Sequence, residues 1–481
     1  MSNGNENFVR EITPQSQDYS QWYLDVIKKA ELVDYAPVKG CMVIRPYGYA
    51  IWENMKLGLD RRIKETGHEN AYFPLFIPES LLQKEADHVE GFAPEVAWVT
   101  KGGQEELSEK LAIRPTSEAM IGEMYSKWIQ SWRDLPVLIN QWANVVRWEK
   151  STRPFLRTSE FLWQEGHTAH RTEEGAEEET LKMLDVYRDF VENDMAIPVL
   201  KGLKTEKEKF AGALRTYCIE ALMSDGRALQ AGTSHNLGQH FAEVFDITFL
   251  DQDDERKYVW QTSWGVSTRL LGALIMVHGD DRGLQIPPKV APNQIVMVPI
   301  MPKNKQELVK EESQKLYDEL KKDFRVKLDD REEQTPGWKF NEWEMRGVPI
   351  RLEIGPKDIE KEQVVLVRRD NGEKIFVKRD KLHDKLEEVL ADIQDSMYNR
   401  AKEYLEDNTR VAKDMDELSS IIEEHKGMVK AHWCGSGNCE EHVKDETKAT
   451  IRLIPFNPNT GEDCISCGKG DSKEVVFARA Y

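Results

Sequence analysis

Polar and apolar residues alternate most regularly between positions 137 and 170. With the two-residue period of a β-strand, Gln141, Arg147 and Glu149 share one face, while Trp142 and Trp148 belong to the other. A basic, turn-like connector over 150–157 follows. The alternation then resumes, so the pattern predicts an antiparallel strand, loop and strand with one core face and one face that carries chemistry.

The second predicted strand, from Glu160 to Ala169, places Phe161, Trp163, Glu165 and His167 on one face. Guanidinium groups suit phosphate, carboxylates suit amines or ribose, and aromatic rings suit a base, so this face is typical of a nucleotide site. The alternative is an ordinary charged surface hairpin.

The rest of the first 288 residues reads as a mixture of helices and strands. Apolar spacing predicts helices over 19–32, 48–66, 173–195 and 206–223, with strand, loop and strand over 226–249 and strand then helix over 258–288. Thr116 lies at the mouth of a further helix, where a cap and a ligand role are equally favoured. Arg269 lies near a helix start, where a cation is unexpected unless it meets an anion or a ring.

Pro288 and Pro292 bracket a domain boundary. Beyond it the periodicity predicts strands over 294–299, 324–328, 350–354, 363–368 and 374–378, with helices over 303–322 and 338–346. A long amphipathic helix with Leu386, Ile393 and Leu405 on its apolar side follows. This order predicts a small mixed α/β domain.

Length and charge limit the interpretation. A chain of 481 residues is expected to form two to four domains. The polar N-terminal residues and the lack of a membrane-length apolar stretch predict a cytoplasmic protein without a membrane partner. The net charge of −19 argues against coating of nucleic acid, but residues 289–395 carry 22 Lys+Arg against 24 Asp+Glu. A nucleic-acid partner is therefore expected there, unless the segment is simply near-neutral.

Four of the six cysteines lie in the last 48 positions, as Cys434-x4-Cys439 and Cys464-x2-Cys467. Two such pairs can close a tetrahedral site, and four thiolates leave no open position for catalysis. The spacing favours structural zinc over unpaired thiols.

Several segments together resemble class II aminoacyl-tRNA synthetases, and more closely the prolyl-tRNA synthetases of the archaeal and eukaryotic type. Residues 48–78 are similar to the dimer-interface motif of the class, VVRWE with RTSEFLWQEGH to its second motif, and WGVSTRLLGALIMVHGDD to its third. RPTSE and GTSHNLG resemble segments that distinguish prolyl enzymes, and TPGWKFNEWEMRGVPIRLEIGP resembles their anticodon-binding domain. The resemblance covers essentially the whole chain, including the final Tyr481.

This resemblance implies an α/β multidomain protein. Residues 1–288 would form a class II catalytic domain with an antiparallel sheet, 289–395 a mixed α/β anticodon-binding domain, and 396–481 a small zinc-binding α/β domain. The implied reaction activates L-proline with ATP and Mg²⁺, releases pyrophosphate, and transfers proline from the adenylate to the 3′ end of tRNA(Pro). The resemblance also implies a cytoplasmic homodimer with structural Zn²⁺.

The resemblance also implies roles for individual residues. Arg147 would bridge the proline carboxylate and the α-phosphate, and Phe161 with Arg269 would sandwich the adenine; Arg147 and Arg269 would be the catalytic pair. The remaining ATP contacts would come from Glu149, Arg157, Thr158, Gln230, Thr233, Ser267 and Thr268. Proline would be bound by Thr116, Glu118, Arg147, Trp163, His167, His235 and Phe92.

Specificity and competing functions remain open at this point. A pocket for proline cannot strongly reject alanine or cysteine, since a missing methylene contributes only about 1–3 kcal/mol. Residues 170–226 leave room for two helices and a short strand only, so no editing domain is expected. The rivals are a seryl or threonyl enzyme, the latter expected to use a Cys/His metal site, and a non-catalytic paralogue, expected to lack the motif arginines.

Overall fold

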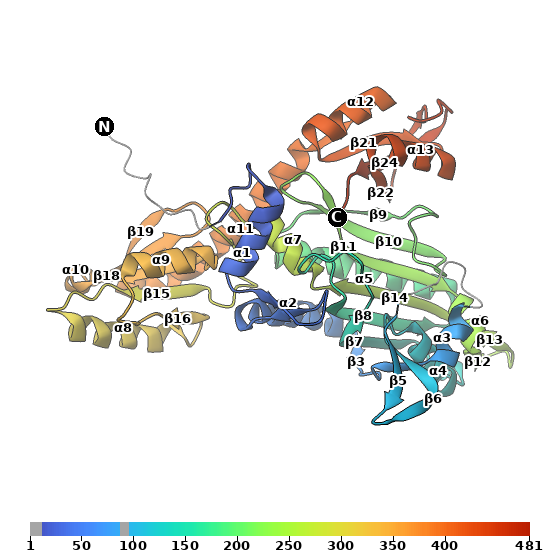
Figure 1. The fold of residues 1–481 in the computed structure, drawn as a ribbon, viewed down its shortest axis with the longest axis horizontal. Helices are drawn as coiled ribbons and strands as arrows, with labels where there is room; N and C mark the ends of the chain where they lie inside the picture. The colour runs from blue at the N-terminus through green and yellow to red at the C-terminus, as the bar shows by residue number, and fades with distance from the viewer. Residues whose placement is uncertain (1–11, 87–95) are drawn as a thin grey trace.

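A computed structural model describes residues 12–86 and 96–481. The largest sheet runs in the order β20-β21-β24-β22-β9-β10-β11-β14-β8-β7-β3, with β23 paired to β24. It therefore passes from the first 288 residues into the C-terminal part of the chain without a break. Figure 1 shows this sheet on one side of the molecule and a second, smaller sheet on the other side.

The first part of the chain carries the helices and short strands that surround the large sheet. They are α1 (Tyr19–Lys29), β1 (Val33–Tyr35), β2 (Met42–Ile44), α2 (Pro46–Glu65), β3 (Glu69–Asn70), β4 (Phe76–Pro78), α3 (Glu79–Ala86), β5 (Trp98–Gly102), β6 (Glu105–Ile113) and α4 (Glu118–Trp128). Strands β4, β6 and β5 form a separate three-stranded sheet with β4 at its edge. The predicted helices over 19–32 and 48–66 are confirmed, and Gly67, at φ +90°, follows the last turn of α2.

The central part of the chain forms most of the antiparallel half of the large sheet. Its elements are β7 (Val137–Val146), β8 (Glu160–His170), α5 (Glu173–Asn193), β9 (Val199–Leu203), β10 (Arg215–Leu222), β11 (Ala228–Gly238), α6 (His240–Phe245), β12 (Thr248–Leu250), β13 (Arg256–Tyr258), β14 (Trp260–Ser267) and α7 (Arg269–His278). Strands β9, β10, β11, β14, β8 and β7 are successively antiparallel, which confirms the expected class of sheet. Tyr187 of α5 packs against Trp264 of β14 in the core beneath it.

The helix predicted over 206–223 is wrong. Residues 215–222 form strand β10, which lies between β9 and β11, and its residues from Thr216 to Leu222 are all buried. A strand that is buried on both faces has no alternation to reveal it, and a short apolar run cannot be distinguished from a buried helix by period alone. The span between His170 and Gly226 thus holds one helix and two strands.

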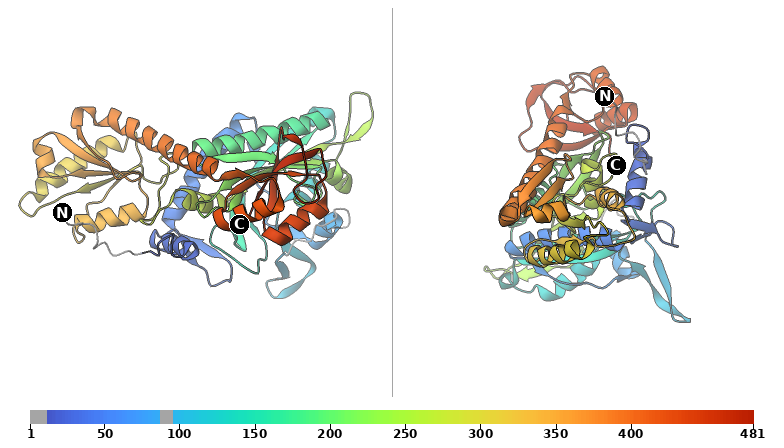
Figure 2. Two further views of the ribbon diagram at one scale, coloured as in Figure 1. Left: turned by 90° about the horizontal axis from the view of Figure 1, so that it is seen from above. Right: turned by 90° about the vertical axis from the view of Figure 1, so that its left-hand side faces the viewer.

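The second sheet belongs to the middle of the chain and has the order β16-β15-β17-β18-β19. Its elements are β15 (Ile295–Pro299), α8 (Gln306–Leu320), β16 (Val326–Leu328), α9 (Pro336–Met345), β17 (Ile350–Ile354), α10 (Pro356–Glu360), β18 (Gln363–Arg368), β19 (Lys374–Lys378) and α11 (Leu382–Asp407). Every predicted strand and helix of this segment is confirmed, and α10 is additional. Helix α11 leads toward the C-terminal part (Figure 2) and contains the predicted boundary at 395, which stays a prediction.

The C-terminal elements complete the large sheet. They are β20 (Thr409–Val411), α12 (Met415–Ser420), β21 (Met428–Trp433), α13 (Gly437–Thr447), β22 (Thr450–Pro455), β23 (Thr460–Glu462) and β24 (Ser472–Ala478). Ile454 of β22 pairs with Leu203 of β9, which joins the two domains through backbone hydrogen bonds. In the described part of the chain, no helix has the length and apolar character required to cross a membrane.

Candidate active site

A cavity of about 310 Å³ opens on one face of the catalytic sheet. Strands β8, β11 and β14 supply its floor, and the mouth of α4, the start of α7 and the β9–β10 loop supply its walls. Eleven residues with predicted roles line it: Thr116, Glu118, Arg147, Phe161, Trp163, His167, Gln230, Thr233, His235, Ser267 and Arg269. The structure therefore brings together residues that are up to 153 positions apart.

The β7–β8 hairpin forms as its alternation predicts, with Val145 opposite Phe161 and Gln141 opposite Glu165. Phe161, Trp163, Glu165 and His167 all face the cavity. The predicted core face of the first strand is wrong at its end: Trp148 is 54% exposed because β7 stops at Val146. Alternation holds only while the residues remain paired in the sheet.

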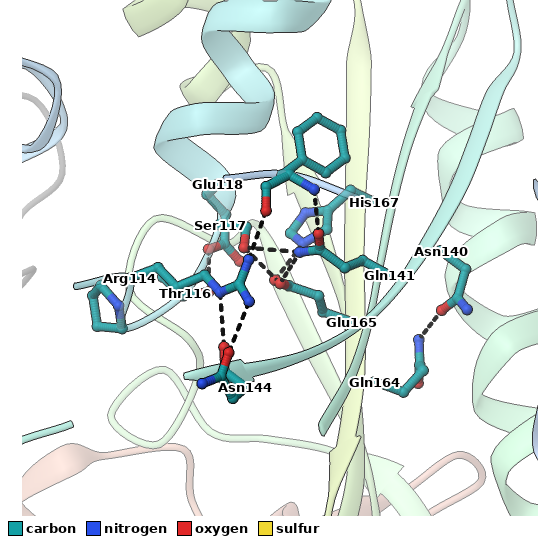
Figure 3. A network of polar contacts seen from close by, with 12 residues as sticks. Arg114, Thr116, Ser117, Glu118, Asn140, Gln141, Asn144, Gln164, Glu165 and His167 are labelled. Atoms are coloured by element: carbon teal, nitrogen blue, oxygen red, sulfur yellow. Dashed lines mark hydrogen bonds and ion pairs between the residues drawn. The ribbon is translucent and has the colours of Figure 1, made fainter. Parts of the chain in front are cut away.

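Below one end of the cavity lies a closed network of buried polar side chains around Glu165 (Figure 3). Ser117 Oγ donates to Glu165 Oε1 over 2.5 Å, and Gln141 Nε2 donates to the same oxygen over 2.8 Å. His167 Nε2 lies 2.9 Å from Glu165 Oε2. Both carboxylate oxygens therefore have partners, and the imidazole of His167 is fixed in orientation.

The pKa values of the two histidines of this end are shifted in opposite directions. Burial favours the neutral form of His167, but the hydrogen bond and charge of Glu165 outweigh it and raise the pKa of His167. Burial would raise the pKa of Glu165, and His167, Ser117 and Gln141 together hold it below its ordinary value. For His235, burial and the charge of His167 lower the pKa to about 3, so His235 is neutral at physiological pH.

Glu118 is the other carboxylate of this end, and it is 8% exposed. Its Oε2 accepts a short hydrogen bond from the hydroxyl of Thr116. Among the residues that the structure describes, Glu118 has no ion-pair partner, and a buried carboxylate without a cation is costly. Of the two alternatives for Thr116, the capping role is wrong, since Ser117 occupies the N-cap position of α4 and Thr116 bonds to Glu118 instead.

Two guanidinium groups, those of Arg147 and Arg269, line the end of the cavity opposite Glu118 and Glu165. Arg147 donates from Nε to the Pro115 carbonyl over 3.0 Å, and its Cζ lies 5.6 Å from the Phe161 ring and 5.4 Å from the Trp163 ring. Arg269 donates from Nε to the Leu156 carbonyl over 3.2 Å. Within residues 12–86 and 96–481 neither guanidinium forms an ion pair.

The pKa values of both arginines are lowered. Partial desolvation of the guanidinium lowers the pKa of Arg147, although the charges of Glu118, Glu165 and Glu149 act in the opposite direction. Burial and then the like charge of Arg147 lower the pKa of Arg269. In both cases desolvation of the guanidinium is the main cause, and an anionic ligand would offset it.

The other residues predicted to bind ATP lie outside the cavity. Arg157 and Glu149 form an exposed ion pair of 2.7 Å. Thr158 and Thr268 line a neighbouring cavity of about 240 Å³, and Phe161 forms a wall shared by both cavities. Phe92 lies outside the described residues. All of these roles stay predictions.

Sequence reasoning assigned no role to several residues of the site. Glu165 was recognised only as a member of the hairpin face; its partners are Ser117, at the N-cap of α4, and Gln141, on β7. Glu208 and Phe210 enter the cavity from the β9–β10 loop, in the segment predicted to be helical. The alternation of β8 identifies Glu165, but no local signal identifies the residues of the loop.

The four clustered cysteines meet at the C-terminal end of the chain. Their sulfur atoms all lie within 4.8 Å of one another, with Cys434 Sγ 3.7 Å from Cys439 Sγ and 3.8 Å from Cys467 Sγ. A tetrahedral ion with sulfur ligands at about 2.3 Å requires sulfur–sulfur distances of about 3.8 Å. The set fits such an ion, and among the described residues it is the one group of this kind.

Comparison with known families agrees with this organisation. Residues 98–278 match the tRNA synthetase class II core domain (G, H, P, S and T), residues 294–389 match an anticodon binding domain, and residues 415–481 match the C-terminal domain of prolyl-tRNA synthetase. These three segments correspond to the three parts of the structure.

Curated relatives are similar over the full length. The chain is 81% identical to a proline–tRNA ligase of Natranaerobius thermophilus and 61% identical to that of Alkaliphilus oremlandii, with 100% of each chain covered. It is 59% identical to that of Symbiobacterium thermophilum, with 99% of each chain covered. The chain therefore belongs to the proline–tRNA ligase family, whose catalytic core is that of the class II tRNA synthetases.

Proposed function

We propose that the protein joins L-proline to tRNA(Pro) in two steps, through a prolyl-adenylate formed from proline and ATP. The observation that carries this proposal is the charge distribution of one cavity. Glu118 is a buried carboxylate without a cation, and Arg147 and Arg269 are guanidiniums without an anion, as judged within the described residues. An amino acid and a triphosphate together supply the missing charges.

Proline is recognised at the Glu118 end. Its ring nitrogen, as an ammonium, has two N–H donors, and Glu118 with Thr116 can accept both. Trp163, His167 and His235 border the same space. His235 is neutral and the Glu165 carboxylate is already paired with His167, so among the described residues that line the cavity Glu118 is the carboxylate placed to attract the ammonium.

Adenylate formation needs positioning more than proton transfer. The carboxylate of proline is already a nucleophile, and its attack on the α-phosphate releases pyrophosphate. Arg147 lies between the amino-acid end and the aromatic ring of Phe161, where it can hold both anions in line and neutralise them. Arg269 faces the same cavity and stacks against the adenine from the side opposite Phe161.

ATP enters as its magnesium complex. Mg²⁺ binds mainly through phosphate oxygens, water and one or two carboxylates, and in the described residues no group of three carboxylates or histidines gathers at this site. The ion supplies further neutralisation of the phosphates. Transfer then occurs when the terminal ribose hydroxyl of tRNA(Pro) attacks the prolyl carbonyl and AMP leaves.

The cysteine cluster is proposed to hold one structural Zn²⁺. The sulfur–sulfur distances of 3.7 and 3.8 Å support four-thiolate coordination. Such an ion has no open position and takes no part in the reaction; it stabilises the C-terminal fold.

We also propose that the chain has the archaeal and eukaryotic architecture, although the relatives named above are bacterial. The match of residues 415–481 to a dedicated C-terminal domain supports this subtype. So does the short span between β8 and β11, which holds only α5, β9 and β10. No editing in cis is expected; hydrolysis of alanyl-tRNA(Pro) by the purified protein would contradict this.

A homodimer in the cytoplasm is proposed as the working form. Phe76, in the proline-bearing edge strand β4, is 44% exposed, and Tyr72, shortly before this strand, is 74% exposed; such apolar exposure is expected where another subunit packs. Sedimentation equilibrium tests this: a mass near twice 55.6 kDa is expected, and a monomer at micromolar concentration would contradict it.

Aminoacylation tests the whole proposal. Purified protein, ATP, Mg²⁺, labelled proline and unfractionated tRNA should give acid-precipitable prolyl-tRNA. Omission of ATP should abolish the product. Failure to charge any tRNA with proline, under conditions where the protein remains folded, would refute the function.

A further inference from the structure

The loop that joins β9 to β10, residues 204–214, forms part of the wall around the amino-acid end of the cavity. Glu208 and Phe210 line the cavity directly. The ring of Phe210 packs on that of His235, with 4.7 Å between the ring centres. The shape of the amino-acid end therefore depends on where this loop is held.

The first half of the loop is held by the C-terminal domain. Lys204 Nζ donates to the carbonyl of Arg452 over 2.7 Å, and Thr205 Oγ1 donates to Glu440 Oε1 over 2.9 Å. Lys207 forms an ion pair with Glu441. These three contacts come from β22 and α13, which lie beside β9 and β10 in Figure 1.

The contact between Thr205 and Glu440 is the most enclosed of those made by α13. Thr205 is 2% exposed and Glu440 is 3% exposed, whereas Lys207 and Glu441 are exposed to solvent by 39% and 43% of their side chains. The hydroxyl of Thr205 also accepts from the backbone N–H of Glu208 over 3.3 Å. The Glu440 carboxylate thus orients the hydroxyl of Thr205. This hydroxyl also bonds to the backbone of the turn from which Glu208 enters the cavity.

The second half of the loop is held by the catalytic sheet. The N–H of Phe210 donates to Thr216 Oγ1 over 3.0 Å, and the N–H of Leu214 donates to the Asn236 carbonyl over 2.8 Å. Thr216 Oγ1 in turn lies 3.0 Å from His235 Nδ1. Loss of the C-terminal contacts would therefore loosen the first half and leave the second half attached.

We infer that Glu440 is a positioning residue for amino-acid binding: through Thr205 it holds residues 205–210 in the conformation that completes the amino-acid end. This inference rests on the proposed function. A loop that is free in the empty protein must be ordered when the substrate binds, which weakens the apparent affinity. Among the described residues, no hydrogen bond, ion pair or ring contact joins this loop to Arg147, Phe161 or Arg269, so the affinity for ATP should change little.

The test compares variants on α13 and in the loop. Glu440→Ala and Thr205→Val remove the hydrogen bond, whereas Glu440→Gln keeps a side-chain carbonyl that can accept from Thr205. Glu446→Ala, an exposed change on the same helix, is the matched control. Each variant is measured for KM of proline and of ATP in pyrophosphate exchange, for Tm, and for hydrogen–deuterium exchange of residues 205–213.

Glu440→Ala and Thr205→Val should each raise the KM for proline roughly fivefold to tenfold, as expected for loss of one buried hydrogen bond. The KM for ATP should stay within about twofold, and amides 205–210 should exchange faster. Glu440→Gln and Glu446→Ala should resemble the wild type, and Thr205→Val with Glu440→Ala should be no worse than either alone.

The inference is overturned if Glu440→Ala leaves the proline KM and loop exchange unchanged, or if both KM values rise together with a lowered Tm. The latter would indicate general destabilisation. Hydrogen–deuterium exchange needs no substrate. It therefore shows whether Glu440 anchors the loop even if the wild-type protein activates another amino acid or no amino acid at all. Failure of the proposed function is thus separate from failure of this inference.

Discussion

The two ends of the active-site cavity differ in how far the protein satisfies its own charges. At the amino-acid end, Glu165 is surrounded by Ser117, Gln141 and His167, and all four are buried. At the nucleotide end, within the described residues, the hydrogen bonds of the Arg147 and Arg269 guanidiniums go to backbone carbonyls, and Arg157 has a side chain that is 64% exposed. The contrast suggests a preformed pocket that selects the amino acid beside an open, cationic surface that binds and releases phosphates.

This comparison predicts that loss of Arg147 has the largest effect, because Arg147 serves both ends. Arg147→Ala should lower kcat for pyrophosphate exchange by about 100-fold to 1000-fold, the usual effect of removing one preorganised donor to a developing charge. Arg256→Ala, on the exposed strand β13, is the control. Near-normal exchange by Arg147→Ala would remove it from the centre of the mechanism.

A change at Glu118 should act on the amino-acid end alone. Glu118→Gln keeps an acceptor for Thr116 but removes the charge that attracts the ammonium, so the KM for proline should rise roughly 30-fold or more, with little change in the KM for ATP. Glu123→Gln, on the same helix, should behave as the wild type. An equal rise in the KM for proline and the KM for ATP would argue against two ends of the cavity that bind their substrates separately.

The Glu165–His167 pair should give a pH-dependent stability. The folded pKa of His167 is raised, so its contribution is complete below its ordinary pKa of 6.5 and is lost as the pH rises through the raised value. The folded pKa of Glu165 is lowered, so its contribution is complete above 4.5 and is lost as the pH falls through the lowered value.

Glu165→Gln should therefore lower the apparent Tm by roughly 5 °C between about pH 4.5 and 6.5, because a buried ion pair is broken from one side. Outside this pH range, the difference in Tm between Glu165→Gln and the wild type should become smaller. Glu160→Gln, exposed on the same strand, is the control. A Tm difference that is constant from pH 4 to pH 9 would contradict the assigned charges.

The smallest effect is expected at the exposed part of the nucleotide end. Arg157→Ala breaks the exposed ion pair with Glu149 and should raise the KM for ATP by less than about tenfold, with the KM for proline unchanged. Arg188→Ala, on the surface of α5, is the control. A 100-fold rise in the KM for ATP would show that Arg157 lies close to the phosphates in the reacting complex.

Alternation and helical spacing predicted much of the fold, because most elements have one buried face. The hairpin of β7 and β8 and helix α11 follow from period alone. Strand β10 does not, because both of its faces are buried. Trp148 was predicted to lie on the core face but is exposed, because the two-residue period does not show at which residue the pairing of the strands ends.

The site was predictable to the extent that it repeats along single elements. Trp163 and His167 follow from the alternation of β8, but the bond between Ser117 and Glu165 joins residues 48 positions apart, which no local pattern reveals. The contact between Thr205 and Glu440 spans 235 positions and depends on the pairing of β9 with β22. Tertiary contacts of this kind are set by the packing of whole elements.

Amino-acid-dependent exchange of pyrophosphate into ATP, run separately with all twenty amino acids, tests the central claim most directly. The account predicts strong stimulation by proline and much weaker stimulation by alanine and cysteine, which fit the pocket but fill it poorly. Stimulation by serine or threonine without stimulation by proline would contradict it.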